Sequence, residues 1–428
     1  LNLIDTPGHT DFSYEVSRAL EAVDGAILLV DATQGIQAQT LANFNSARKA
    51  GLKIIGAINK IDLNPIMAEE AMQGVADLIG VPKSEIFKIS GKTGQGVEGL
   101  LAAVIKQIPP PKVKNNLSPK VFQALIFDSF YHEHKGIVAE IRVFNGEVKN
   151  GDQVKLIASN TNFKVKELGY FHPELKIDAK LENGQIGYVA TGLKDPELLK
   201  IGDTLINDSQ VSSEEIEKLA LPGYKEPQPV VFVSFYPEEN EDYENLKSAF
   251  GKLKLNDSAL RFEPDFNEFL GRGFKTGFLG KLHFEITAER LEKEFNIKTV
   301  HSFPSVAYKV KRSAKSDYEI ISNPKDFPTD YVEAMEPISR IEIFAPKEYI
   351  GVIMQLQQSF RLQKMETKIF GNNIYLSANL PLADLIRDFD DQLKSISAGY
   401  ASFNYEVNDY QKAQVEKLEV LIAEQPVS

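Results

Sequence analysis

The fold of this chain is decided by its first residues, LNLIDTPGH (residues 1–9). The apolar run 1–5 is typical of a buried strand that ends on the carboxylate of Asp5, and a turn then leads into a helix expected over 12–21. A carboxylate at a strand end can hold Mg²⁺ through water, and Gly8 has no side chain to keep its backbone N–H from a phosphate. His9 follows where a ring could orient an attacking water. The alternative is an ordinary strand–turn–helix with an acidic cap.

The next hundred residues continue an alternation of short apolar runs with longer amphipathic ones. Strands are expected over 1–5, 25–31, 53–59 and 86–90, and helices over 12–21, 37–50, 66–79 and 97–108. A run of three prolines at 109–111 ends the last helix. Residues 1–111 are therefore predicted to form an α/β domain with a parallel sheet covered on both faces. Such sheets bind ligands at the carboxyl ends of their strands.

Two further polar motifs follow expected strands. Asp62, in the motif Asn59-Lys60-Ile61-Asp62, can accept hydrogen bonds from N1–H and the 2-amino group of guanine. Asn59 can bond the base edge, and the stem of Lys60 can lie along its face. Backbone N–H groups of Ser90-Gly91-Lys92 could bond the guanine O6. Each motif alone could be a polar loop, but the three in this order at strand ends indicate a guanine-nucleotide site.

The chain beyond residue 111 changes character twice. Residues 118–208 are short β-rich runs separated by Asn-Gly turns, which predicts a small β-barrel. Residues 226–303 and 337–410 each read as βαββαβ, the split-βαβ (ferredoxin-like) α+β sandwich. The join over 304–336 reads as irregular, 214–219 reads as helical, and 411–428 reads as the start of an unfinished C-terminal domain.

Composition sets limits on function. The 428 residues are 43% hydrophobic and 25% charged, which is the balance of a globular protein, and no apolar run is long enough to span a bilayer. The absence of Cys excludes disulfides and thiolate metal sites. A net charge of −12 argues against a purely electrostatic nucleic-acid binder, so any RNA contact is expected to use local basic patches. Because the chain opens on Leu1 inside an expected strand, we expect a fragment truncated at both ends.

The ordered motifs resemble a known family. Residues 5–12 (DTPGHTDF), 30–35 (VDATQG) and 59–62 (NKID) together form the pattern of translational GTPases. Residues 136–152 resemble the barrel domain that follows in these factors. The runs 271–286 and 397–402, with LPGY at 221–224, are similar to the LepA type, elongation factor 4. Only about 35 residues join the two α+β modules, too few for the extra domain of elongation factor G.

The resemblance implies a ribosome-dependent GTP hydrolase with a fidelity role, moving tRNAs back by one codon on wrongly translocated ribosomes. His9 would be catalytic, and Asp5 would organise Mg²⁺ through water. The GTP-binding residues implied are Asp5, Thr6, Pro7, Gly8, His9, Asn59, Lys60, Asp62, Ser90, Gly91 and Lys92. The partners implied are GTP or GDP, ribosomal RNA and proteins, and tRNA. A cytoplasmic monomer is implied, with the cytoplasmic face of the cell membrane as an alternative resting place, or the mitochondrial matrix if the source is organellar.

One departure from the family pattern bears on activity. The sequence contains no Gly-x-x-x-x-Gly-Lys-Ser/Thr phosphate-binding loop and no first-switch Thr, so the α/β domain is predicted to be a partial P-loop NTPase fold. These 428 residues are therefore expected to be inactive alone, although the intact protein is expected to be a GTPase. The alternatives are a BipA-type or elongation-factor-G-like GTPase, or a non-hydrolysing ribosome-binding module if the truncation is natural.

Overall fold

The computed structural model describes most of the chain, namely residues 1–111, 118, 121–195, 198–207, 217–221, 228–257, 259–370, 372–418, 420–422 and 425–427. Most of the expected helix over 214–219, and LPGY beyond Leu221, lie outside these residues; residues 217–219 form a 3₁₀ turn. Within the described ranges, none of the helices combines the length and apolar character that a membrane crossing needs.

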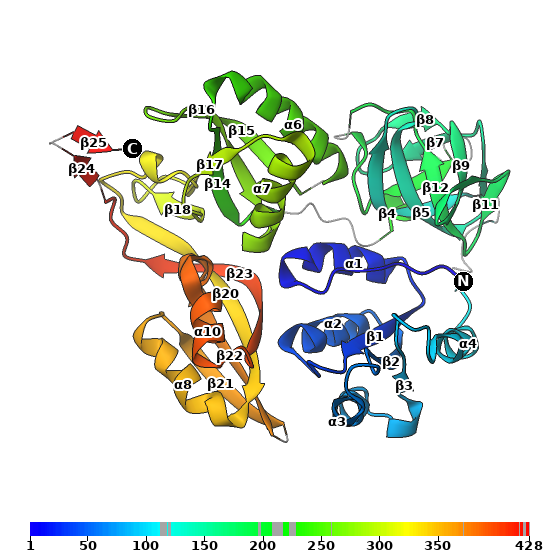
Figure 1. The fold of residues 1–428 in the computed structure, drawn as a ribbon. Coiled ribbons are helices and arrows are strands. Elements are labelled where there is room, and N and C mark those ends of the chain that lie inside the picture. Colours follow the sequence, from blue (N-terminus) through cyan, green and yellow to red (C-terminus); the bar gives the residue numbers. More distant parts are fainter. Residues whose placement is uncertain are drawn as a thin grey trace.

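The α/β domain is built on a parallel sheet of order β1-β2-β3, formed by Gly25–Asp31, Lys53–Asn59 and Phe87–Lys88. Helices α1 (Ser13–Glu21), α2 (Ala38–Lys49), α3 (Pro65–Ile79) and α4 (Val97–Gln107) surround it in Figure 1. Asp31 pairs in register with Asn59, so both strands end at the same edge. Two buried apolar clusters pack around the sheet, which confirms the predicted α/β class.

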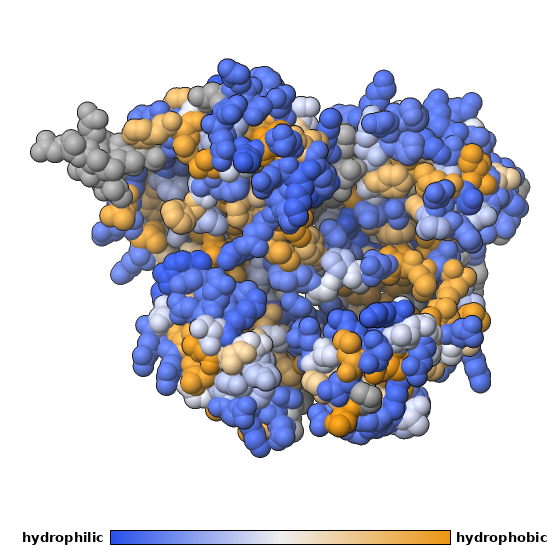
Figure 2. All heavy atoms as spheres, in the orientation of Figure 1, coloured by the Kyte–Doolittle hydropathy of each residue, from blue (hydrophilic) through white to orange (hydrophobic). Residues whose placement is uncertain are grey.

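The expected strand over 1–5 is wrong, because these residues have no regular secondary structure. A strand is stable only when its backbone groups pair with a neighbour, and the described sheet contains β1, β2 and β3 but no strand beside residues 1–5. The side chains of Leu1 and Leu3 are consequently 71% and 67% exposed. Figure 2 shows hydrophobic residues gathered near the N-terminus, where Figure 1 places it beside the barrel.

The barrel is an eight-stranded sheet of order β10-β9-β12-β5-β4-β13-β7-β8. Its interior holds a buried apolar cluster, and β6 pairs with β11 in a separate two-stranded sheet. The bounds are β4 Gln123–His132, β5 Gly136–Asn145, β6 Glu147–Lys149, β7 Gln153–Leu156, β8 Asn162–Lys164, β9 Glu167–His172, β10 Glu174–Ile177, β11 Lys180–Glu182, β12 Ile186–Ala190 and β13 Thr204–Asn207.

The two α+β modules share one topology, as predicted. In the first, the sheet order is β15-β16-β14-β17; in the second, the corresponding order is β21-β22-β20-β23, so the first strand of each module is central. Their buried apolar residues form one continuous cluster. The bounds are β14 Val231–Pro237, α6 Tyr243–Asn256, β15 Arg261–Asn267, β16 Gly271–Phe278, α7 Lys281–Phe295 and β17 Thr299–His301, then β20 Glu333–Pro346, α8 Ile350–Gln355, β21 Gln363–Phe370, β22 Asn373–Pro381, α9 Leu382–Asp384, α10 Asp390–Ile396 and β23 Ser402–Ala413.

The expected irregular join over 304–336 is wrong, because it contains β18 (Tyr308–Lys311) and β19 (Glu319–Ile321) and runs into β20. The reason lies in the length of β20. Strand β22 pairs with β20 only from Ile338 onward, which leaves the first residues of β20 with an open edge. Strand β18 fills that edge, with Lys309 opposite Met335.

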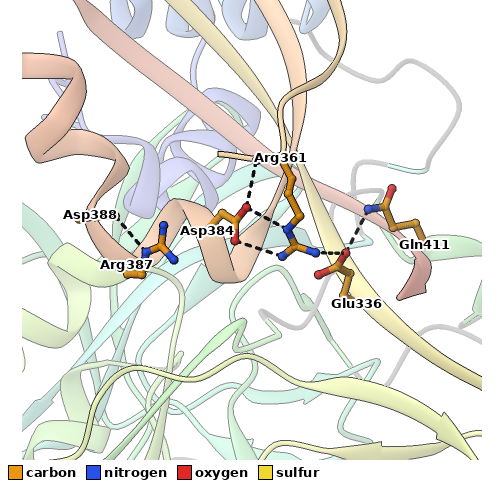
Figure 3. A network of polar contacts seen from close by, with 6 residues as sticks. All are labelled: Glu336, Arg361, Asp384, Arg387, Asp388 and Gln411. Carbon is orange, nitrogen blue, oxygen red and sulfur yellow. Dashed lines mark hydrogen bonds and ion pairs between the residues drawn. The ribbon is translucent and has the colours of Figure 1, made fainter. Parts of the chain in front are cut away.

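A polar network fastens the second module (Figure 3). Arg361 lies just before β21 and donates to Glu336 on β20 at 2.9 Å and to both carboxylate oxygens of Asp384 at 3.1 Å. Gln411 on β23 donates to Glu336 at 3.1 Å. The Glu336 side chain is only 2% exposed, and both donors bond its Oε1, so they supply hydrogen bonds that water cannot reach to give that oxygen, whereas the buried Oε2 has no partner among the described residues.

Candidate functional site

The first part of the site is the pair of loops that follow β2 and β3. The side-chain oxygen of Asn59 accepts from the backbone N–H of Lys60 at 2.8 Å and from that of Gly91 at 2.9 Å. One side chain therefore joins the loop 59–62 to the loop 90–92, as expected for two motifs at one sheet edge. Asn59 thus holds the two loops together with its oxygen, and the Gly91 N–H is already occupied. Asp62 and Lys92 are exposed and accessible to a base.

Lys60 adopts an uncommon backbone conformation, with φ of 63°. Left-handed backbone costs a non-glycine residue free energy, and it concentrates at functional sites. The ion pair from its ammonium to Asp31 at 2.7 Å fastens the side chain back over the end of β1. Burial alone would raise the pKa of Asp31, but hydrogen bonds from Lys60 and Thr33 outweigh burial and hold the pKa below its usual range. Lys60 is thereby ordered before any nucleotide binds.

The loop after β3 is rigid for local reasons. The Ser90 side chain is fully buried and accepts from the Thr93 N–H at 3.2 Å. Gly96 has a φ of 74°, and a Cβ there would lie 2.0 Å from the Lys88 carbonyl oxygen. Only glycine fits that position, so the loop returns tightly over the end of β3.

Residues 5–9 lie elsewhere. Asp5, Thr6 and Pro7 line an open cavity of about 540 Å³ between α1 and the barrel, together with Arg18, Phe127 and other residues. Asp5, Thr6 and Gly8 are exposed, whereas Pro7 and His9 are half-buried. The described lining of this cavity includes none of Asn59, Lys60, Asp62 or residues 90–92. The structure thus joins the two guanine motifs to each other by a hydrogen bond, whereas residues 5–7 line a cavity whose described lining includes neither motif.

The chemistry of Asp5 fits Mg²⁺ bound through water. Among the described residues, no cluster of three or more His, Asp or Glu side chains could hold a metal on its own. Magnesium usually keeps several waters and takes one or two protein carboxylates together with phosphate oxygens. One exposed carboxylate is therefore sufficient for such a site, with the remaining ligands coming from water and the nucleotide.

Charged residues line the boundary between α1 and the barrel. Arg18 lies 3.8 Å from Asp128 on β4, and Arg142 on β5 bonds Asp24 at 2.7 Å. Glu140 stands directly across the ladder from Asp128. Burial, and then the charge of Asp128, raise the pKa of Glu140 to about 7. This boundary therefore holds more carboxylate than its arginines neutralise.

Two residues of the site were not given roles from the sequence. Asp31 belongs to the motif at 30–35, and the signal for its role is that its carboxylate ends the strand expected over 25–31, next to the strand that leads into the guanine loop. Asp11 is 4% exposed, yet accepts hydrogen bonds from both α+β modules. Nothing local predicts those contacts, because the donors lie 271 and 394 residues away.

Family models match four successive parts of the chain. They describe the elongation factor Tu GTP-binding domain over 1–110, elongation factor Tu domain 2 over 136–206, elongation factor G domain III over 226–302 and the elongation factor G C-terminus over 333–421. This order of domains, on the fold described above, defines the chain as a translational GTPase, a GTP hydrolase of the translation machinery.

Full-length relatives narrow the class. The chain is 45% identical to elongation factor 4 of Rubrobacter xylanophilus, 43% to that of Aquifex aeolicus and 42% to that of Thermotoga maritima. In each case all of the chain is matched, and 69%, 70% and 68% of the relative is covered. The chain belongs to the elongation factor 4 family, as the sequence motifs predicted. A crystal structure of a protein from Thermus thermophilus shares the fold, with a TM-score of 0.59 at 18% identity, covering 96% of this chain and 86% of that one.

Proposed function

We propose that this protein is an elongation fidelity factor that moves tRNAs back by one codon on wrongly translocated ribosomes, with GTP and Mg²⁺. The proposal that the nucleotide is a guanine nucleotide rests on one observation, which is the bridge that Asn59 makes between the loops at 59–62 and 90–92. The translational part rests on the elongation factor 4 relatives. The protein is proposed to act as a cytoplasmic monomer; a resting place on the membrane stays a prediction from the resemblance.

Each proposed site residue has one task. Asp62 accepts from the Watson–Crick edge of guanine, which alone among the common bases presents two adjacent donors there. Lys60, fixed by Asp31, covers the face of the base, and residues 90–92 cover its O6 edge. Gly8 offers a backbone N–H to the terminal phosphate, and His9 orients the attacking water. Mg²⁺, when bound beside Asp5, supplies positive charge to the phosphates.

Toeprinting on ribosomes that carry tRNAs in the post-translocation position tests the proposal. Adding the intact protein with GTP is expected to move the toeprint back by one codon, whereas these 428 residues alone, which contain no phosphate-loop motif, are expected to leave it in place. Co-sedimentation with ribosomes in the same samples is the control for binding. Binding without a toeprint shift would refute back-translocation, and binding that is equal with and without GTP would favour the non-hydrolysing ribosome-binding module instead.

A further inference from the structure

Asp11 lies at the meeting point of three domains. It follows the segment 5–9 and begins the turn into α1, and its side chain is almost completely buried. Its carboxylate accepts from the backbone N–H groups of Leu282 at 2.7 Å and His283 at 3.4 Å, and from the hydroxyl of Tyr405 at 2.9 Å. Figure 1 shows α1 between the first α+β module and α2, with β23 beside it.

The contact with α7 is a helix cap supplied by another domain. Helix α7 begins after Gly280, which has no side chain to satisfy the first N–H groups of the helix. Asp11 accepts from the second and third helical residues, which are the positions that an N-cap side chain normally serves. A buried carboxylate at a helix N-terminus is also favoured by the helix dipole. The first turn of α7 is therefore completed only while Asp11 is in place.

The fit is tight enough to exclude a side chain at Gly280. A Cβ on Gly280 would lie 2.2 Å from the carboxylate carbon of Asp11. The Gly280 backbone is extended, so alanine there meets no backbone strain and would act through this contact alone. Tyr405, from the second α+β module, is the other donor to Asp11. Burial raises the pKa of Tyr405 well above its usual value, and the neighbouring charge of Asp11 raises it further, so the hydroxyl stays protonated and donates.

Asp11 is also in contact with His9. The Asp11 N–H donates to His9 Nδ1 at 3.3 Å, and the same nitrogen lies 3.6 Å from the Asp11 carboxylate. We infer that Asp11 is a positioning residue that sets the place of the His9 ring according to how α7 and Tyr405 are docked. A ribosomal contact that moves either module would thereby change the alignment of His9, which links docking to hydrolysis. The effect on hydrolysis rests on the catalytic role proposed for His9. The coupling between module docking and the position of the His9 ring does not depend on that role.

The test follows the His9 ring by NMR in the variants Tyr405→Phe and Gly280→Ala, without nucleotide. The chain has only six histidines, and His9→Gln assigns the signal. Both variants are expected to shift the His9 signal, leave that of His134 in the barrel unchanged, and speed exchange of the Leu282 and His283 amides by about tenfold or more. Gly351→Ala is the matched control, because nothing lies within 4 Å of a Cβ there.

The outcomes separate the link from the proposed function. An unchanged His9 signal in both variants would overturn the inference, and so would a shift of equal size in Gly351→Ala. Far-ultraviolet circular dichroism verifies that each variant is folded; Tyr405→Phe removes one hydroxyl only, so it carries the test if Gly280→Ala does not fold. Because no nucleotide or ribosome is present, failure here leaves back-translocation untouched, and a negative toeprint leaves this link untouched.

Discussion

Replacing Glu140 by Gln should remove one contribution that makes the folded protein less stable as the pH rises towards about 7. Glu140 lies on β5 beside the boundary with α1, opposite Asp128 in the ladder and near the guanidinium of Arg18. Burial, followed by the charge of Asp128, raises its pKa from 4.5 to about 7. The folded protein therefore binds a proton at Glu140 more tightly than the unfolded chain does.

The sign and the size follow from linkage. Because the folded pKa is raised, the contribution of Glu140 to stability is fully present below pH 4.5 and is lost as the pH rises through about 7. Each pH unit of difference corresponds to about 1.36 kcal/mol, so the loss across this window is about 3 kcal/mol. Gln has a similar shape to Glu but carries no charge. The free energy of unfolding of Glu140→Gln, relative to that of the wild type, should therefore rise by this amount between pH 4.5 and 8.

Urea unfolding from pH 4 to 8, followed by circular dichroism and tyrosine fluorescence, measures the difference between the two proteins. A multidomain chain need not unfold in one step, so the transition that includes the barrel is the one to compare. Glu174→Gln, at an exposed position on β10, is the matched control. Parallel stability profiles for wild type and Glu140→Gln would refute the reasoning, and so would an NMR titration of Glu140 with a midpoint below about 5.

Three further predictions concern the guanine loops, the second α+β module and nucleotide binding. Asn59→Ala removes the acceptor shared by the Lys60 and Gly91 amides, so hydrogen exchange of both amides should quicken about fivefold to tenfold. The Gly94 amide donates to the Ser90 carbonyl oxygen and should keep its exchange rate. Unchanged exchange rates of the Lys60 and Gly91 amides in the variant would contradict the bridge. Arg361→Met should lower the free energy of unfolding in urea by about 1–3 kcal/mol, because Glu336 stays buried without its cation; this value is discounted because Arg361 is half-exposed. The control Arg387→Met removes a more exposed ion pair and should lower it by less than about 1 kcal/mol. Equal losses in the two variants would argue against the network. Titration with a fluorescent guanine nucleotide should show no micromolar binding to these 428 residues, which contain no phosphate-loop motif, and micromolar or tighter binding would prove that expectation wrong.

The sequence was informative wherever chemistry repeats locally. Periodicity located most of the helices and strands and the repeated βαββαβ order, because side-chain period and turn residues are short-range properties. It misplaced a strand at 1–5, since pairing depends on a neighbouring strand that an apolar run cannot report. It missed β18 and β19 for the same reason, because their place depends on an edge of β20 left open by β22.

By itself, the sequence determined the family, and it predicts which side chains read guanine, because a base is read by fixed residue types at fixed spacing along one loop. Only the tertiary structure decided what those residues rest on. The left-handed backbone of Lys60 and its pair with Asp31 depend on two strands being in register. The burial of Asp11 depends on α7 and β23 arriving from the far end of the chain. Contacts of this kind are set by the packing of whole domains, and no local pattern of residues encodes them.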